Sequence, residues 1–332
     1  MHIAFKDATD GVGIKSRFDR SPCSAKSCHF NAPSKVKLST IRDLLFADDC
    51  VLAALSQEAL QRLCDCFAKA AHRFGLTISI KKTEALYQPA PGNLYEPPVI
   101  TIDGKLLNAV DNFKYLGSII SNDASFDAEI TARIAKATAA FGRLVKRLWT
   151  NNGIQLNTKI GVYKAAVLTS LLYGCETWTL TKKQVRRLEK FHQSTLRKIA
   201  RIKWFHKVTN YEVLSRCNIS SLQSMIDKAR LRWTGHVIRM KDDRIPKALI
   251  YGRLTTGTPK RGNYNTYLNN VKSTLRECDI SCTRLEKLAS KRVNWRDTVK
   301  KGIAVSEGNR IEHLVDKRRK RKARADLAPL LT

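Results

Sequence analysis

The chain has 332 residues, of which 43% are hydrophobic, enough apolar material for packed cores; this excludes a wholly disordered protein. Its 60 Lys and Arg against 29 Asp and Glu leave a net charge of +31, which favours a polyanion, above all nucleic acid, as partner. The charge is uneven, because residues 1–120 carry 15 basic and 12 acidic side chains whereas residues 121–332 carry 45 and 17.

Cysteine usage and hydropathy favour a soluble intracellular protein. The nine cysteines include no Cys-x-x-Cys pair; Cys23, Cys28 and His29 cluster loosely, but reduced thiols are the favoured interpretation. The longest apolar stretch, residues 165–175, is about half the length that spans a bilayer. We therefore expect a soluble, nuclear and/or cytoplasmic protein with no membrane partner.

The first distinct element is a hairpin that carries two carboxylates. Residues 1–39 contain many turn formers and are expected to be a loop-rich lead-in with at most a strand. Two apolar runs, residues 40–47 and 50–55, then flank Asp48 and Asp49. This pattern of strand, acidic turn and strand predicts a β-hairpin with both carboxylates at its tip.

A helix and further short strands follow the hairpin. Ser56 is suited to the N-cap, and Gly75 to the C-terminal stop, of an amphipathic helix. Residues 76–80 alternate as a strand does. Residues 99–107 predict a hairpin around an Asp-Gly turn, and residues 113–120 predict another strand pair.

Beyond residue 122 the pattern becomes helical. Apolar spacing and capping residues predict five helices. Four of them cover residues 130–148, 158–173, 181–202 and 221–240, and a further one begins at Thr209. Residues 255–267 are expected to form a flexible basic loop, and residues 268–300 recover helical periodicity. The basic run 317–322 is expected at a solvated helix end or tail, as a nuclear import signal or a nucleic-acid contact.

Adjacent carboxylates on an apolar hairpin need a physical explanation. Buried and unpaired, Asp48 and Asp49 would be costly, and a divalent cation such as Mg²⁺ removes that cost. Two such ions can bind the attacking and leaving oxygens of a phosphoryl displacement. An Asp-Asp pair alone is explained as readily by an ordinary polar turn, so the surrounding sequence decides between the two.

The surrounding sequence resembles the palm of a reverse transcriptase. Four blocks occur in order: Phe-Ala-Asp-Asp at 46–49, the amphipathic helix, Gly-Leu-Thr-Ile-Ser-Ile-Lys-Lys-Thr at 75–83 and Phe-Lys-Tyr-Leu-Gly at 113–117. Over about residues 40–300 the chain is similar to reverse transcriptases of non-LTR retrotransposons of the RTE-like or Jockey-like kind, which carry an endonuclease upstream. Residues 172–178 and 231–237 also look like the post-palm region of such elements.

The resemblance implies a role for each block. Asp48 and Asp49 would be catalytic residues of the metal-binding motif, with Asp48 the more direct ligand of Mg²⁺ or Mn²⁺. The lysine beside the incoming triphosphate would be Lys81 or Lys82, where a cation can offset developing pyrophosphate charge. The residues matching the primer grip are Phe113, Tyr115, Leu116 and Gly117.

Two blocks of the family have no match in the chain. These are an aspartate on an upstream palm strand and a block containing Gly and Gln; Asp7, Asp10 and Asp19 precede the hairpin, but no convincing strand pattern surrounds them. We therefore expect the C-terminal part of a retrotransposon polyprotein. Its RNA-templated DNA synthesis would take place in the full-length parent, and the chain by itself would be inactive.

The expected fold is α+β, a partial palm followed by a mainly helical, basic thumb-like region. The expected domains are residues 1–39 (lead-in), 40–121 (partial palm), 122–254 (thumb-like and post-palm region) and 255–332 (basic C-terminal region). The implied partners are an RNA template, a DNA primer and deoxynucleoside triphosphates. The alternative is a basic helical nucleic-acid-binding protein without catalysis.

Basic side chains of the helical region are candidates for contacts with a primer–template backbone. We single out eight of them: Arg143, Lys146, Arg147, Arg186, Arg187, Arg197, Lys198 and Arg201. Four tryptophans are interleaved with the basic clusters, and a place in the core explains them better than a contact with nucleic acid: Trp149, Trp178, Trp204 and Trp233.

Overall fold

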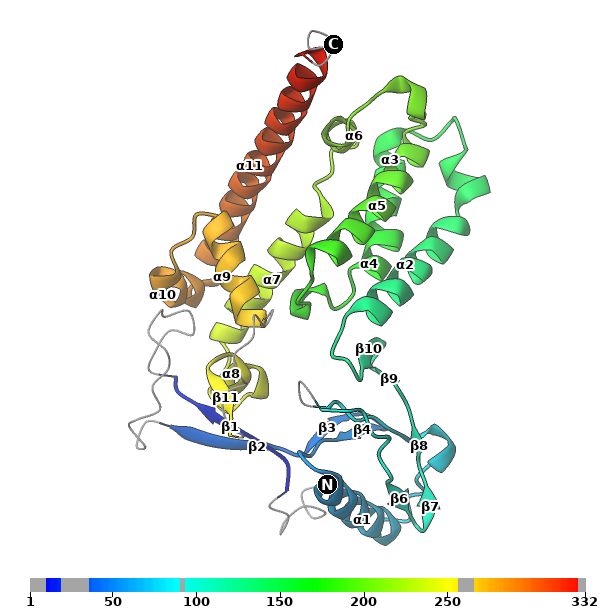
Figure 1. Cartoon of the computed structure of the whole chain (residues 1–332), viewed down its shortest axis with the longest axis vertical. Coiled ribbons are helices and arrows are strands. Elements are labelled where there is room, and N and C mark those ends of the chain that lie inside the picture. Colours follow the sequence, from blue (N-terminus) through cyan, green and yellow to red (C-terminus); the bar gives the residue numbers. More distant parts are fainter. Residues whose placement is uncertain (1–9, 19–35, 90–92, 256–265, 328–332) are drawn as a thin grey trace. The chain divides into compact units, whose positions relative to one another are not determined.

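The computed structural model describes residues 10–18, 36–89, 93–255 and 266–327. Helices and small sheets are both present, as expected of the α+β class (Figure 1). The chain divides into two compact units, residues 1–129 with 240–264 and residues 130–239 with 265–332. The return of the chain to the first unit after residue 239 was not predicted, and the predicted boundaries at 39, 121 and 254 stay predictions.

Some sequence features fall outside the described residues. The cluster of Cys23, Cys28 and His29 lies there, as does most of the predicted basic loop over residues 255–267. The seven cysteines within the described ranges are free thiols, in agreement with the reduced interpretation.

A three-stranded antiparallel sheet joins the two chain segments of the first unit. β1 (Val12–Ser16) is the central strand, with β2 (Lys37–Ile41) on one side and β11 (Gly252–Leu254) on the other. The short helix α8 (Ile245–Ile250) precedes β11. Ile14, opposite both Ser39 and Leu254 in the register, is 1% exposed, so its side chain anchors this sheet.

Helix α1 (Gln57–Arg73) begins and ends where its capping residues predict. The Ser56 hydroxyl accepts a hydrogen bond from the Ala59 amide at 3.2 Å, and Gly75 ends the helix at a φ of 67°. The buried face of α1 packs against short strands in a core cluster of Cys64, Ala68, Ala85, Ile100, Ile102 and Leu107. Leu52, from the acidic hairpin, packs at the edge of this cluster.

The predicted strand over residues 76–80 is wrong. Residues 76–79 pair with no strand, and the chain turns directly after them, where the amides of Lys82 and Thr83 both donate to the Ser79 carbonyl at 3.0 Å. The result is a 3₁₀ turn over Ile80–Lys82. Strand pairing starts only at β5 (Glu84–Ala85), parallel to β8 (Asn108–Ala109). Alternating residues show that a segment can form a strand, but not whether another strand lies beside it to pair with.

The two further hairpins agree with prediction. Asp103 and Gly104, both at positive φ, form the two-residue turn of the first hairpin. The strands of the two hairpins are β6 (Thr101–Ile102) with β7 (Lys105–Leu106), and β9 (Asn112–Tyr115) with β10 (Ser118–Ser121).

The second unit consists of helices. In chain order they are α2 (Asp127–Gly142, which starts in the first unit), α3 (Leu156–Val162), α4 (Thr169–Leu171), α5 (Lys182–Ile199), α6 (Asn210–Arg216), α7 (Leu222–Ile238), α9 (Tyr267–Glu277), α10 (Leu285–Ser290) and α11 (Arg292–Leu327). Two π-helical segments follow α2 and α3, Val145–Trp149 and Tyr163–Leu168. Thr181 caps α5 and a capping box at Thr209 starts α6, as predicted; Thr181 also forms a capping box, with Gln184.

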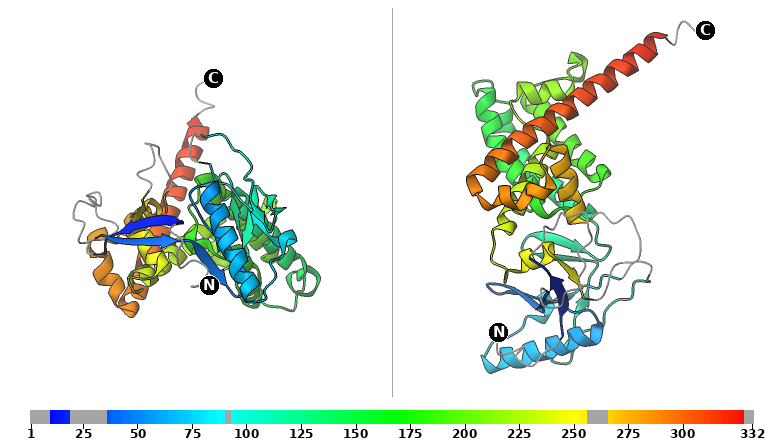
Figure 2. Two further views of the ribbon diagram at one scale, coloured as in Figure 1. Left: turned by 90° about the horizontal axis from the view of Figure 1, so that it is seen from below. Right: turned by 90° about the vertical axis from the view of Figure 1, so that its left-hand side faces the viewer.

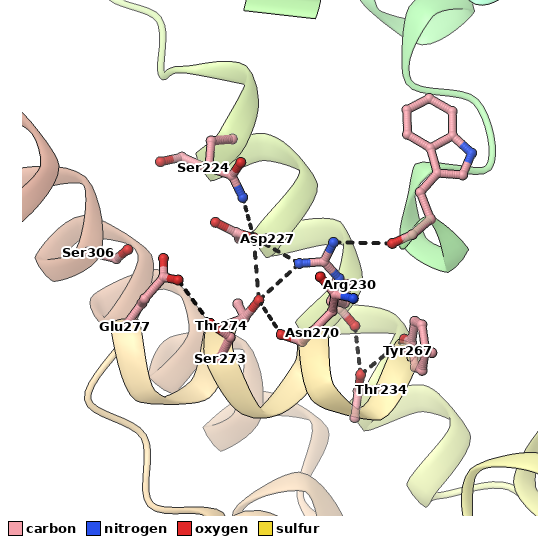
Figure 3. A network of polar contacts seen from close by, with 12 residues as sticks. Ser224, Asp227, Arg230, Thr234, Tyr267, Asn270, Ser273, Thr274, Glu277 and Ser306 are labelled. Atoms are coloured by element: carbon pink, nitrogen blue, oxygen red, sulfur yellow. Dashed lines mark hydrogen bonds and ion pairs between the residues drawn. The ribbon is translucent and has the colours of Figure 1, made fainter. Parts of the chain in front are cut away.

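Helix α7 is the centre of this unit and contacts α5, α9, α10 and α11. Its buried Asp227 accepts hydrogen bonds from Arg230 at 3.0 Å and from Arg310 at 3.1 Å. Arg230 also donates to the Thr274 hydroxyl at 2.9 Å and to the Trp178 carbonyl at 3.2 Å (Figure 3). This buried charge network, which was not predicted, links α7 to α9, to α11 and to the segment before α5.

The distal part of α11 stands away from the other helices of its unit (Figure 2). The basic run falls there, and side chains 317–321 are exposed, as predicted for a solvated helix end. Among the described helices, none is both long and apolar enough to cross a membrane.

Candidate metal and nucleic-acid site

The strands β3 (Asp43–Phe46) and β4 (Asp49–Leu52) form the predicted acidic hairpin. Their antiparallel register pairs Phe46 with Asp49, so that Ala47 and Asp48 are the two turn residues. Ala47 has a φ of 53°, in the left-handed region that favours glycine. Asp48 and Asp49 are both exposed. The hairpin is therefore confirmed, while the metal-binding role of its carboxylates stays a prediction.

This hairpin is anchored at its base and exposed toward its tip. At the base, Leu52 packs on the core cluster and the Ala53 amide donates to the Arg42 carbonyl at 2.8 Å. Toward the tip, Leu45 and Phe46 are 44% and 61% exposed. Contiguous apolar exposure beside two carboxylates is typical of a surface that a ligand or another segment covers.

The predicted primer-grip hairpin contacts the acidic hairpin. Its turn consists of Leu116 and Gly117, both at positive φ. The Tyr115 hydroxyl donates to the Leu44 carbonyl at 3.3 Å. Burial raises the pKa of Tyr115, and the negative charge of Asp49 raises this pKa further. Tyr115 thus contacts strand β3 of the acidic hairpin and is affected by the charge of Asp49.

Two further contacts position the primer-grip hairpin. The rings of Phe113 and Tyr115 stack with 6.5 Å between centroids, so both aromatic residues lie on one face of β9. On β10, the Ile119 amide donates to a carboxylate oxygen of Glu129 at 2.8 Å. Glu129 is buried, so this bond fixes β10 against the first turn of α2.

Lys81 and Lys82 lie on the 3₁₀ turn that replaces the predicted strand. Both side chains are exposed. Within the described part of the chain, neither lysine forms an ion pair with Asp48 or Asp49. Ile80 packs on the same core cluster as Leu52, so the two segments share a core without the lysines meeting the carboxylates.

The acidic hairpin provides part of the ligand set that a magnesium ion requires. Mg²⁺ prefers oxygen ligands and usually combines one or two carboxylates with waters and substrate phosphates. Asp48 and Asp49 fit that chemistry as carboxylates exposed to solvent. No group of three or more His, Cys, Asp or Glu that could hold a metal occurs among the described residues. The remaining ligands would therefore come from substrate or from a further carboxylate.

The eight predicted nucleic-acid contacts fall into two groups. Arg187, Arg197 and Arg201 donate hydrogen bonds of 2.6 to 2.9 Å to other parts of the second unit. These three arginines thus hold helices and loops together. The remaining five side chains are exposed, directly after α2 or on α5: Arg143, Lys146, Arg147, Arg186 and Lys198.

The tryptophans differ in their environments. Trp149 and Trp178 are buried, as predicted, and Trp233 is half-buried. The prediction is wrong for Trp204, which is 89% exposed between α5 and α6. The signal that could have revealed this is a lysine on each side of the short aromatic segment.

Relatives of the chain are found among mobile-element proteins. A putative uncharacterized transposon-derived protein of Caenorhabditis elegans is 27% identical over 217 residues, 63% of this chain and 76% of that protein. The RNA-directed DNA polymerase from mobile element jockey of Drosophila funebris is 24% identical over 185 residues, 54% of this chain and 20% of the polymerase. The RNA-directed DNA polymerase from mobile element jockey of Drosophila melanogaster is 23% identical over 164 residues, which are 49% of this chain and 17% of the polymerase.

The chain is similar to a transposon-derived protein and to RNA-directed DNA polymerases of the mobile element jockey. This finding confirms the resemblance seen in the sequence. The match spans a fifth or less of each jockey polymerase, so it does not by itself assign polymerase activity to this chain. No family model and no solved structure matches the chain significantly.

Proposed function

We propose that the chain supplies the metal-binding hairpin and the primer grip of a non-LTR retrotransposon reverse transcriptase. The observation that carries this proposal is the contact between the two hairpins: the Tyr115 hydroxyl donates to the Leu44 carbonyl, next to the base of the acidic hairpin, and the negative charge of Asp49 acts on Tyr115. A polymerase must hold the primer terminus beside its metal ions, because the attacking hydroxyl and the metal have to meet. Similarity to the jockey polymerases supports the same function.

Each group has a chemical task in this proposal. Asp48 is the direct metal ligand and Asp49 supports it. The bound Mg²⁺ or Mn²⁺ would supply charge stabilisation to the phosphates of the incoming deoxynucleoside triphosphate. Lys81 or Lys82 offsets negative charge on the departing pyrophosphate. The primer-grip residues position the DNA primer, and the basic helices bind the duplex that it forms with the RNA template.

Catalysis also requires a further carboxylate in the metal site, and the described residues contain no group of three or more His, Cys, Asp or Glu that could hold a metal. A strand bearing that carboxylate would cover the exposed apolar side chains Leu44, Leu45 and Phe46. We therefore expect no primer extension by the chain alone, and metal-dependent DNA synthesis when a segment supplying the missing aspartate is joined to it.

Primer extension on an RNA template tests this function. The protein is a hybrid in which the fingers and N-terminal palm of a complete relative are fused ahead of Thr40. Asp48→Asn should abolish synthesis, because it removes the ligand charge and keeps the shape. Lys81→Ala or Lys82→Ala, whichever is the matching lysine, should slow synthesis by about a hundredfold without eliminating it.

The matched control is Asp103→Asn, which changes another exposed aspartate in a hairpin turn of the same unit. This variant should retain the activity of the parent hybrid. If the hybrid binds primer–template and its Asp48→Asn variant is equally active, the acidic hairpin is only a turn.

A second candidate function is nucleic-acid binding without catalysis. The charge of the chain favours this function, because residues 121–332 carry 45 basic and 17 acidic side chains. Six of the eight singled-out basic residues are also exposed. This function needs no metal. Salt-dependent binding by the chain, together with a hybrid that binds primer–template but makes no DNA, would favour it over the polymerase.

A further inference from the structure

A short 3₁₀ turn, Trp204–His206, lies between α5 and α6 (Figure 1). Two adjacent aromatic rings of this turn are exposed. Trp204 and Phe205 are 89% and 57% exposed, and no large apolar side chain among the described residues is more exposed than Trp204. An indole left in water forgoes the favourable free energy of its burial. A bound partner that covers the rings would recover this free energy.

The aromatic segment has a defined shape before any partner binds. The Lys203 amide donates to Nδ1 of His206 at 3.1 Å and closes the 3₁₀ turn. The Phe205 ring packs edge-on against His206, at 4.6 Å between centroids, and against Trp204, at 5.9 Å. Arg197 of α5 holds the chain just beyond the turn through two hydrogen bonds of 2.9 Å. A surface ordered in advance loses little conformational entropy on binding.

The charge around the rings is positive. Between Glu189 and Glu212 the sequence contains six Lys and Arg and no acidic residue. Lys198, Lys203 and Lys207 of this stretch are exposed. The neighbouring loop 150–157, which Arg201 contacts through a hydrogen bond of 2.6 Å, also has no acidic side chain. A polyanion therefore complements this surface.

We propose that Trp204 and Phe205 form a stacking platform for unpaired bases of single-stranded nucleic acid, with Lys203 and Lys207 binding the adjacent phosphates. Every base has a π-face, so stacking on exposed rings binds single strands with little sequence preference. A duplex keeps these faces inside its own stack. The inference rests on the proposed function, in which the chain binds nucleic acid. It adds that this surface recognises single-stranded and not double-stranded nucleic acid.

The test compares single-stranded with double-stranded binding by the full chain. The probes are a labelled oligo-dT of about 15 nucleotides and a duplex of the same length, followed by fluorescence anisotropy. Trp204→Ala should weaken binding of oligo-dT by about fivefold to a hundredfold and leave duplex binding within about twofold. Trp204→Phe, which keeps a ring, should stay close to the parent, whereas Trp204→Leu should behave as Trp204→Ala.

Intrinsic fluorescence gives a second measurement. Trp204 is the most exposed of the five tryptophans, so oligo-dT should quench the long-wavelength emission of the parent and not that of Trp204→Phe. The proposal is overturned if all three variants bind oligo-dT as the parent does, or if Trp204→Leu restores binding as well as Trp204→Phe.

A membrane surface is the competing partner, because Trp and Lys together also suit anionic lipids. Loss of binding to phosphatidylserine vesicles in Trp204→Ala, with oligo-dT binding unchanged, would overturn the stacking platform in favour of a membrane. A hybrid without polymerase activity but with Trp204-dependent binding of oligo-dT contradicts only the catalytic function. Nucleic-acid binding that does not depend on Trp204 contradicts only the stacking platform.

Discussion

Ala47 adopts a backbone conformation that two-residue hairpin turns usually assign to glycine. Its φ of 53° costs an L-residue about 1 kcal/mol or more. Strain of this kind concentrates at functional sites, where the surrounding structure maintains it. Here the anchor is Leu52 at the hairpin base, and the strained residue directly precedes Asp48, the proposed metal ligand.

Buried His192 makes the stability of the second unit depend on pH. Its Nδ1 lies 2.8 Å from the Tyr163 hydroxyl and its Nε2 lies 3.3 Å from the Ser220 carbonyl. Burial lowers the pKa of His192 from 6.5 to about 4, against an opposing effect of the Ser220 hydrogen bond. Between pH 4 and 6.5 the unfolded chain therefore binds more protons than the folded chain, and acidification through this window destabilises the fold.

We predict that His192 accounts for a loss of about 2 kcal/mol in the free energy of unfolding between about pH 7.5 and pH 5. Urea unfolding of the parent and of His192→Gln at both pH values measures this term. The variant should lose about 2 kcal/mol less than the parent, because glutamine does not titrate. Equal pH dependence in the two proteins would contradict the prediction.

At the scale of elements, helices α7 and α11 meet where a glycine faces a tryptophan. The Trp295 indole donates to the Leu231 carbonyl at 2.9 Å and lies directly against Gly235. A Cβ at position 235 would collide with the indole ring. The close approach of the two helices therefore requires glycine, despite its low helix propensity.

Gly235→Ala should lower the free energy of unfolding by about 1–3 kcal/mol, because the buried indole has to move. The control is Gly308→Ala on α11, where an added Cβ meets nothing within 4 Å. The control should be neutral or more stable by up to about 1 kcal/mol, since alanine favours the helix. Thermal unfolding followed by circular dichroism compares them, and a Gly235→Ala protein as stable as the control would disprove the packing argument.

At the scale of the whole molecule, the uneven charge governs binding to polyanions. Residues 1–120 are almost balanced, with 15 basic and 12 acidic side chains, whereas the remainder carries 45 and 17. Each phosphate contacted by a basic side chain releases counterions from the nucleic acid. Binding through residues beyond 121 should therefore weaken steeply with salt and depend little on sequence.

We predict at least five phosphate contacts, and so a slope of log K against log salt of about −4.5 or steeper on duplex DNA. Titration of a labelled duplex at several salt concentrations measures it. Replacing Arg143, Lys146, Arg147, Arg186 and Lys198 by serine should flatten the slope. A comparison variant that replaces the five basic residues 317–321, themselves a candidate nucleic-acid contact, removes the same charge. If its slope falls equally, the first five residues contribute no more to binding than this other basic surface.

The sequence by itself determined the features whose causes are local. Ser56 and Gly75 delimit α1, Thr181 caps α5 and a capping box at Thr209 starts α6, because a cap forms with residues three or four positions away. The acidic hairpin was predictable for the same reason, since its turn and its two apolar strands are contiguous.

Only the tertiary structure decided the features that depend on distant partners. Residues 76–80 have a strand pattern but form no strand. The Tyr115 hydroxyl donates to the Leu44 carbonyl, and buried Asp227 pairs with both Arg230 and Arg310. Trp204 lies outside the core. Alternating hydrophobicity or clustered charge indicates which structure or contact a segment is able to form. Which backbone groups, charges or apolar surfaces meet is set by packing between segments far apart in the chain, and no local pattern records it.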